Sequence, residues 1–289
     1  MVVSVSVVIP CYNQGHFVVE TIDSVLASDL DDLEIIVIND GSTDEYTNTL
    51  LTNLTKPKTK VIFTDNQGVC SARNKGIEMA KGRYIFPLDA DDLIYPQYLS
   101  KAKKILDEKS DIGIVYAQGE LFGLQSGEWK LKPYNFSRFL NSNSIPVCAM
   151  FRKQDYIRTK GYNSNMVYGL EDWDFWLSLL ELGVGVAKIE EVLFRYRIQS
   201  VSRTSKMKMF MNESRKQIVK NHFRLYAKNV FRLKPQYVRI LFEKENRTQI
   251  YKNDKILYLK FLLSKIKILP DDIFCCIKAS FKKRIKEKP

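Results

Sequence analysis

The chain has 289 residues, 45% of them hydrophobic and 27% charged, which is typical of a folded protein and excludes a disordered, collagen-like or coiled-coil chain. The net charge of +12 is uneven: residues 205–289 hold 23 Lys and Arg against 7 Asp and Glu, so residues 1–204 are net acidic. The five cysteines lack metal-binding spacing, and neither a signal peptide nor a run of about 18 apolar residues is visible. We therefore expect a reduced, cytoplasmic protein without a transmembrane helix.

Strand-like and helix-like patterns alternate over residues 4–118. Strands are predicted at residues 5–10, 33–38, 61–63 and 84–88, and helices at residues 16–28, from an N-cap at Thr43, and at residues 71–81, ending at Gly82. This alternation predicts an α/β fold with a mostly parallel sheet flanked by helices on both faces. In such sheets, ligands bind beyond the carboxyl ends of the strands.

The pattern changes after residue 118. Residues 112–132 predict a strand, a hairpin and a return strand, residues 133–144 a loop, residues 147–152 a strand, residues 171–182 an amphipathic helix, and residues 184–197 two short strands. Beyond residue 205 the pattern is helical and basic. The chain is thus predicted to contain one α/β domain over residues 1–204 and a basic helical C-terminal extension over residues 205–289.

Acidic side chains follow two of the predicted strands. Asp89 and Asp91 come directly after the strand at residues 84–88, and their hard oxygens suit Mg²⁺ or Mn²⁺. Asp40 follows the second strand and can accept hydrogen bonds from a base edge or a ribose hydroxyl. Each cluster can also be an ordinary turn, since Asp favours turns and caps and Gly41 supplies an unusual backbone angle. The shared sheet edge favours a ligand site.

A third acidic pair, Glu171 and Asp172, opens the predicted helix at residues 171–182. Carboxylates in the first turn of a helix commonly interact with the helix dipole. A carboxylate facing a cleft can also act as the base that deprotonates a hydroxyl nucleophile. Residues 168–170 would let such a base approach a ligand.

Five segments in order resemble glycosyltransferase family 2, the large inverting family with the GT-A fold. They are residues 6–13 (SVVIPCYN), 39–44 (NDGSTD), 68–77 (GVCSARNKGI), 84–92 (YIFPLDADD) and 169–174 (GLEDWD). The resemblance covers roughly residues 4–200 and includes a DXD motif at residues 89–91. Within the family, the chain resembles the glycosyltransferases of bacterial polysaccharide biosynthesis. It implies a nucleotide-sugar half at about residues 1–118 and an acceptor half at about residues 119–204, with acceptor specificity in residues 119–145 and 163–170.

The resemblance also implies roles for single residues. Asp40 would bind the base, and Asp89 the ribose or sugar. Asp91 would hold the metal, and Asp172 would deprotonate the acceptor hydroxyl in a single in-line, inverting attack. Pro10 and Tyr12 would line the nucleoside pocket, Arg73 would lie near the ribose or diphosphate, and Glu171, Trp173, Arg197 and Gln199 are candidate contacts to the acceptor or diphosphate.

One segment departs from the family pattern. Many members have a histidine after a Tyr-Arg pair, and this histidine helps to bind metal or diphosphate. Residues 196–202 (YRIQSVS) contain none, so either Gln199 and Arg197 replace it or Asp91 and phosphates alone hold the metal. His16 is interpreted as structural.

The basic tail has several interpretations. Residues 256–269 form an apolar face broken by lysines, and residues 274–288 add further basic residues, as in helices that lie on anionic membranes. The alternatives are a set of solvated, lysine-rich helix faces, packing of the tail on the catalytic domain, or a dimer contact. Membrane contact would place the protein peripherally on the inner face of the cell membrane, near a lipid-linked acceptor.

The predicted activity is transfer of a sugar from a nucleoside diphosphate sugar, UDP-linked by default, to a hydroxyl of a glycan or lipid-linked glycan. Two alternatives stay open. A sugar-1-phosphate nucleotidyltransferase usually has a Gly-rich basic loop after its first strand, whereas residues 11–15 read CYNQG. A non-catalytic nucleic-acid-binding module would interleave aromatic and basic residues, a pattern that is not visible, so no nucleic-acid partner is expected.

Overall fold

The computed structural model describes residues 3–200 and 208–241. Contacts divide the chain into two compact units, Met1–Ile218 and Val219–Pro289. The predicted division after residue 204 stays a prediction. The structure describes no helix long and apolar enough to cross a membrane. The membrane-binding prediction for residues 256–288 lies outside the described residues.

The first part of the chain builds a parallel sheet. The strands are β1 (Val5–Cys11), β2 (Leu33–Asp40), β3 (Thr59–Thr64) and β4 (Tyr84–Pro87), in the spatial order β3-β2-β1-β4. β1 and β2 consist almost entirely of buried residues, about half of them Val or Ile, as expected for central strands covered on both faces. The polar residues Asn39 and Asp40 lie at the carboxyl end of β2.

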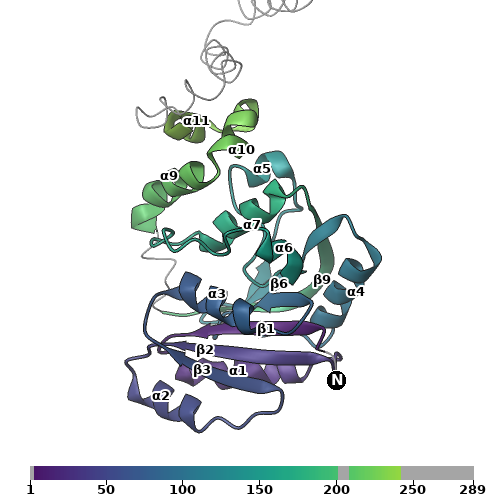
Figure 1. Cartoon of the computed structure of the whole chain (residues 1–289), viewed down its shortest axis with the longest axis vertical. Coiled ribbons are helices and arrows are strands. Elements are labelled where there is room, and N and C mark those ends of the chain that lie inside the picture. The colour runs from purple at the N-terminus through teal and green to yellow at the C-terminus, as the bar shows by residue number, and fades with distance from the viewer. Residues whose placement is uncertain (1–2, 201–207, 242–289) are drawn as a thin grey trace, which may run out of the picture. The chain divides into compact units, whose positions relative to one another are not determined.

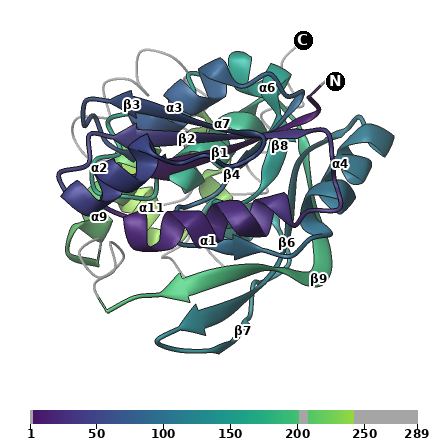
Figure 2. The same ribbon diagram turned by 90° about the horizontal axis from the view of Figure 1, so that it is seen from below.

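Helices cover both faces of this sheet (Figures 1 and 2). α3 (Val69–Met79) packs on β1 and β2, while α1 (Gly15–Leu26) and α2 (Glu45–Thr52) lie together on the other face. α1 is amphipathic, with Val18, Ile22 and Val25 buried at helical spacing. The N-cap of α2 is Asp44, whose side chain accepts from Thr47 N, so the prediction of Thr43 as the cap was wrong. α3 ends at Met79, before the predicted end at Gly82.

The second part of the chain extends the same sheet. Its elements are β5 (Leu93–Ile94), α4 (Tyr98–Glu108), β6 (Ile112–Gly123), β7 (Gly127–Trp129), α5 (Phe136–Phe139), β8 (Met150–Arg152), α6 (Lys153–Ile157), α7 (Glu171–Glu181) and β9 (Gly185–Ile198). β8 pairs antiparallel with β4 and β6, and β6 pairs parallel with β9. β1, β2, β3, β4, β6 and β9 therefore run in one direction, which makes the curled sheet mostly parallel.

Several predictions for this part were incomplete. Residues 133–144, predicted as a loop, contain the short helix α5, capped by Asn135. Residues 184–197, predicted as two strands, form the single strand β9, whose register on β6 shifts near Ala117 and Gln118. α4 was not predicted. The helical prediction beyond residue 205 is supported through residue 241, where η1 (Lys208–Phe210), α9 (Met211–Asn221), α10 (Phe223–Lys228), η2 (Val230–Arg232) and α11 (Pro235–Leu241) follow one another.

Candidate active site

The loops after β1 and β2 are tied together at the carboxyl edge of the sheet. Asn13 Oδ1 accepts from the backbone N–H groups of Thr43 and Asp44 at 2.9 and 3.0 Å, and Asn13 N donates to Ser42 Oγ at 3.0 Å. Sequence reasoning missed this role of Asn13. Its φ of 54° in the left-handed region is a local sign of such a turn, since Asn tolerates that conformation. Tyr12, the residue before Asn13, is 43% exposed, so its side chain is available to a ligand.

Asp40 is buried at the end of β2. One carboxylate oxygen accepts from Gln67 N at 3.0 Å, which holds the segment before α3 against this strand. Gly41 follows with φ +61°, and a Cβ there would lie 2.5 Å from Asn66 N, so only glycine fits this close turn. Pro10, near the end of β1, is paired in register with Ile38 of β2, so Pro10, Tyr12 and Asp40 all lie at one edge of the sheet.

Asp89 and Asp91 follow β4 at the same edge. Burial and the nearby charge of Asp89 raise the pKa of Asp91 to about 6, against a hydrogen bond from Gln199 Nε2 to Asp91 Oδ2. Arg197 Nε donates to the backbone oxygen of Asp91 at 2.7 Å. Both residues suggested as substitutes for the family histidine therefore contact Asp91.

The donor set at Asp91 fits a hard divalent cation. The described residues contain no group of three or more His, Cys, Asp or Glu arranged to hold a metal. Mg²⁺ and Mn²⁺ commonly bind one or two carboxylates and take further oxygens from water and substrate phosphates. Asp91 supplies one such carboxylate, and a cation bound to it would also relieve its repulsion with the nearby Asp89.

Arg197 is held from several sides. Its backbone N–H donates to buried Asp92 at 2.9 Å, its guanidinium pairs with Glu20, and it lies 4.3 Å from the ring centre of Phe122 and 4.7 Å from that of Phe17. These contacts fix β9 against the loop that carries Asp91.

Arg73 connects Asp89 to the start of α7. Its guanidinium is buried, donating from Nη2 to Asp89 Oδ1 at 2.7 Å and from Nη1 to Glu171 Oε1 at 3.1 Å. Burial opposes its charge, but Asp89 and Glu171 together raise the pKa of Arg73 well above its ordinary value. Arg73 thus contacts Asp89, itself a candidate donor contact, and its position near the ribose or diphosphate stays a prediction.

Asp172 lies in the first turn of α7 and is held by two donors. Its Oδ1 accepts from Trp173 N at 2.8 Å, and its Oδ2 accepts from Asn143 Nδ2 at 2.8 Å. Burial and the charge of Glu171 raise the pKa of Asp172 to about 7, against the Trp173 N–H and Arg73. The preceding Leu170 has φ 65°, a conformation that non-glycine residues rarely adopt and that is concentrated at functional sites.

Asn143 and Trp173 contact Asp172 in different ways. Asn143, 29 residues before Asp172, was missed because nothing in its own segment marks it. Trp173 is buried, and its indole Nε1 donates to Phe139 O at 3.0 Å, so its ring packs in the interior. The acceptor or diphosphate contact suggested for Trp173 has no support from these interactions.

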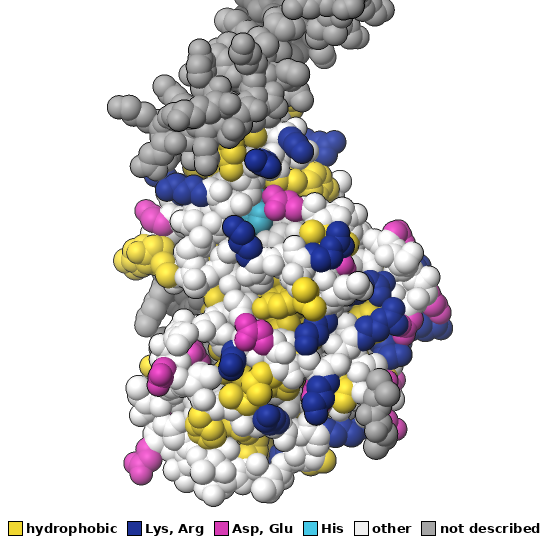
Figure 3. Space-filling view, in the orientation of Figure 1, with side chains coloured by type: hydrophobic (Ala, Val, Ile, Leu, Met, Phe, Trp, Pro, Cys, Tyr) yellow, Lys and Arg dark blue, Asp and Glu magenta, His cyan; other side chains and the backbone are white. Residues whose placement is uncertain are grey.

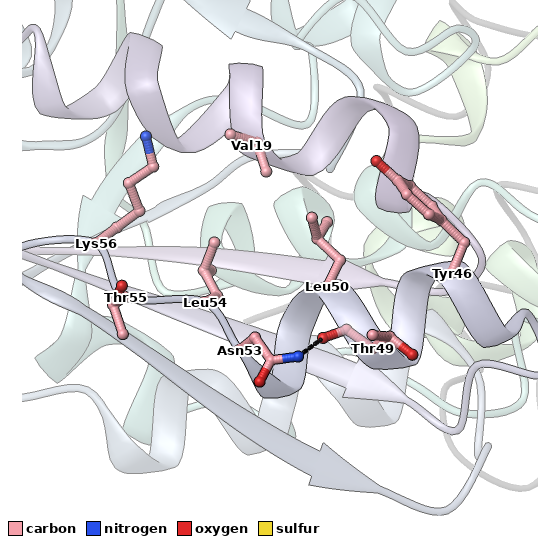
Figure 4. A pocket seen from close by; sticks show the side chains of 8 residues that line it. All are labelled: Val19, Tyr46, Thr49, Leu50, Asn53, Leu54, Thr55 and Lys56. Carbon is pink, nitrogen blue, oxygen red and sulfur yellow. Dashed lines mark hydrogen bonds between the residues drawn. The ribbon is translucent and has the colours of Figure 1, made fainter.

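A pocket of about 460 Å³ lies elsewhere, between α1 and α2 (Figure 4). Val19 points toward Leu50 and Leu54, with Tyr46 near one end and Lys56 near the other. His16 stacks on Tyr46 with ring centres 4.6 Å apart, in keeping with its interpretation as structural. The candidate acidic residues at positions 40, 89, 91, 171 and 172 do not line this pocket, so it is separate from the candidate active site.

The family follows from a match to the model for glycosyl transferase family 2 over residues 6–158. The chain belongs to this family. The resemblance inferred from the five segments is thereby confirmed, and the chain is a glycosyltransferase. The matched residues include β1 through β8 and with them Asp40, Arg73, Asp89 and Asp91.

Family members of different kinds are similar to this chain. An uncharacterised glycosyltransferase of Methanocaldococcus jannaschii is 26% identical over 221 residues, which cover 71% of this chain and 76% of that protein. The chondroitin synthase of Pasteurella multocida is 30% identical over 187 residues, 62% of this chain but 19% of the synthase. The chain thus matches about a fifth of the length of that synthase.

Solved structures show the same fold. TarS residues 1–349 of S. aureus, in complex with UDP-GlcNAc, superposes with a TM-score of 0.59 at 16% identity, covering 82% of this chain and 79% of that one. The GT-A-type fold expected from the sequence is therefore confirmed for the α/β part of the chain.

Proposed function

We propose that this chain is an inverting glycosyltransferase that moves a sugar from a UDP-linked donor to a hydroxyl of a glycan or lipid-linked glycan. One observation carries the proposal: the acidic residues at the carboxyl edge of the parallel strands are linked, through Arg73, to the first turn of α7, where Asp172 lies. Donor-binding and base functions therefore share one site. The complex of TarS with UDP-GlcNAc supports the choice of donor class.

The donor would bind along the sheet edge. Asp40 would accept hydrogen bonds from the base, Pro10 and exposed Tyr12 would flank the nucleoside, and the partly exposed carboxylate of Asp89 would bind a ribose or sugar hydroxyl. Asp91, with Gln199 against it, would hold Mn²⁺ or Mg²⁺. When bound, such an ion neutralises charge on the departing nucleoside diphosphate.

Asp172 would act as the general base. Its carboxylate takes the proton of the acceptor hydroxyl while the new bond to the anomeric carbon forms and the bond from that carbon to the diphosphate oxygen breaks. The two hydrogen bonds from Trp173 N and Asn143 Nδ2 orient the carboxylate. A pKa near 7 suits a base that must be ionised yet accept a proton near neutral pH.

The test is a panel of nucleotide-sugars incubated with the full chain and Mn²⁺, in parallel with chelator. We expect a UDP-sugar to raise the melting temperature, because a ligand that binds the native state stabilises it. Release of UDP should require both metal and acceptor. If no nucleotide-sugar binds or turns over with metal present, the proposal is wrong. Release of pyrophosphate from a nucleoside triphosphate would instead support a nucleotidyltransferase.

Asp172→Asn tests the base separately. The amide keeps the shape of the side chain but cannot take a proton. General base catalysis typically contributes about 100- to 10,000-fold, so we expect the rate of transfer to fall about 1,000-fold. The affinity for donor should change little. A fully active Asp172→Asn variant would reject Asp172 as the base.

A further inference from the structure

Three elements meet at Arg73. The residue lies on α3, Asp89 follows β4, and Glu171 begins α7, so one guanidinium joins segments 16 and 98 residues away in sequence. The Nη2–Oδ1 distance to Asp89 is 2.7 Å and the Nη1–Oε1 distance to Glu171 is 3.1 Å. Tyr162 covers the guanidinium, with its ring centre 5.3 Å from Cζ. The contacts of the Arg73 guanidinium described here are thus all to side chains of the protein itself.

The geometry of this group is fixed by its chemistry. A guanidinium is planar and donates in set directions, so it fixes the relative positions of two carboxylates more tightly than an ammonium group can. Arg73 is 2% exposed, and its Nε has no hydrogen-bond partner among the described residues. The desolvation cost of burying such an ion pair can exceed the gain from its attraction, so stability alone does not account for it.

We infer that Arg73 is a positioning residue of the transfer reaction, which holds Asp89 and Glu171 in one buried bridge and so fixes Asp172 relative to the donor. Asp89 would keep its partly exposed side free for a donor hydroxyl, while Glu171 sets the first turn of α7. The inference rests on the proposed function, since it takes Asp172 as the base and Asp89 as a donor contact.

The charges around Asp172 make this role measurable. Glu171 and Asp89 favour the protonated form of Asp172 and Arg73 opposes it, while Tyr162 and Cys70 are further titratable groups beside this cluster. Removing the charge of Glu171 should shift the acid limb of the pH profile to lower pH. Removing the charge of Arg73 should shift it to higher pH. A role in packing alone predicts no such opposite shifts.

The experiment compares Arg73→Lys, Arg73→Met and Glu171→Gln in the full chain. Arg73→Lys keeps the charge but loses the planar fork, so we expect kcat to fall about 100-fold, the scale of a misplacement near 1 Å, while donor Kd rises less than tenfold. Glu171→Gln and Arg73→Met should shift the acid limb of kcat/KM for the acceptor in opposite directions. Donor binding by calorimetry also shows whether each variant is folded.

Arg83→Lys is the matched control. Arg83 also pairs with a carboxylate, Asp107 at 3.3 Å, but it is exposed, and its contacts are to Asp107 and the Tyr84 ring rather than to Asp89 or Glu171. We expect it to leave kcat and the pH profile unchanged. A wild-type kcat in Arg73→Lys, or an unshifted acid limb in Glu171→Gln, would overturn the inference even if Arg73→Met does not fold. Full activity of Asp172→Asn would instead show that Asp172 is not the base. That result would contradict the proposed function itself and is distinguishable from the two results above.

Discussion

At the scale of single residues, the candidate base has an unusual environment. Asp172 is an Asp whose pKa is raised to about 7, first by burial and then by its neighbour Glu171. A base must be deprotonated to act, so kcat/KM for the acceptor should fall about tenfold per pH unit below pH 7 and level off above it. The profile should be measured with saturating donor.

Donor affinity over the same pH range is the control for this profile. It separates protonation of Asp172 from changes in donor binding. A rate that stays constant down to pH 5 would show that no group with a pKa near 7 acts as the base.

Asn143 is the side chain that holds Asp172 from outside its own helix. Its Nδ2 donates to Asp172 Oδ2, while its Oδ1 accepts from Ile145 N at 3.0 Å, which fixes the amide orientation. A hydrogen bond to a charged group contributes about 1.5–3 kcal/mol, so Asn143→Ala should lower kcat about 10- to 100-fold with donor affinity nearly unchanged.

Asn135→Ala serves as the comparison for Asn143→Ala. Asn135 lies in the same region and caps α5, but its Oδ1 accepts from Arg138 N and does not contact Asp172. Equal losses of kcat in the two variants would indicate a general disturbance of residues 133–145 and argue against a specific contact to the base.

At the scale of elements, the sequence was enough to place the candidate acidic residues at strand ends. It was not enough to predict which side chains they contact. Asp40 ends β2 and Asp89 follows β4, and parallel strands end at one edge of a sheet, so the proximity of the two residues follows from topology. The contacts of Arg73 with Glu171 and of Asn143 with Asp172 depend on how distant segments pack. No local pattern encodes them.

The same distinction explains the missed and altered elements. α4 begins after Pro96, and its N-cap, Gln97, makes no side-chain cap hydrogen bond, so the usual start signal is absent. β9 was split in the prediction because Glu190 and Glu191 interrupt its apolar pattern, yet its pairing with β6 carries it across them. Long-range pairing here overrides local pattern.

The packing of α3 on the sheet gives a prediction about stability. Gly76 faces β1 so closely that a Cβ would lie 2.4 Å from Val8 Cγ1, a buried and stiff side chain. Gly76→Ala should therefore lower the free energy of unfolding by about 1–3 kcal/mol through overpacking, although alanine is the better helix former. Denaturant unfolding would measure this.

Lys75→Ala is the matched control for Gly76→Ala. Lys75 is the preceding residue of the same helix and is exposed, so its replacement should leave the free energy of unfolding within about 0.5 kcal/mol. If Gly76→Ala is as stable as the unchanged protein, the close approach of α3 to β1 is not the reason for glycine at this position.

At the scale of the whole molecule, charge is distributed unevenly. Many basic side chains of the unit Met1–Ile218 have acidic neighbours. Near α4, where Figure 3 shows Lys, Arg, Asp and Glu side chains together, Lys103 pairs with Asp107 and Lys104 with Glu108. Residues 205–289 carry 23 basic against 7 acidic residues, without a comparable acidic complement. This excess predicts attraction to anionic surfaces.

Deletion of residues 256–289 tests that prediction. We expect the full chain to bind vesicles containing anionic lipid in a salt-dependent manner, and the shortened chain to bind them more weakly, since each basic residue near such a surface contributes about 1 kcal/mol. Neutral vesicles are the control. Equal binding of both chains would show that this segment is not the membrane contact.

The position of β8 in the sheet has a consequence for biosynthesis. β8 consists of three residues, Met150–Arg152, inserted between β4 and β6, where it pairs with Tyr84 and Ile85. The ribosome completes β1 to β4 long before it reaches β8, so a nascent chain exposes the backbone edge of β4 while about 65 further residues are translated, and exposed strand edges promote aggregation. Translation that stalls before Met150 should therefore yield insoluble fragments.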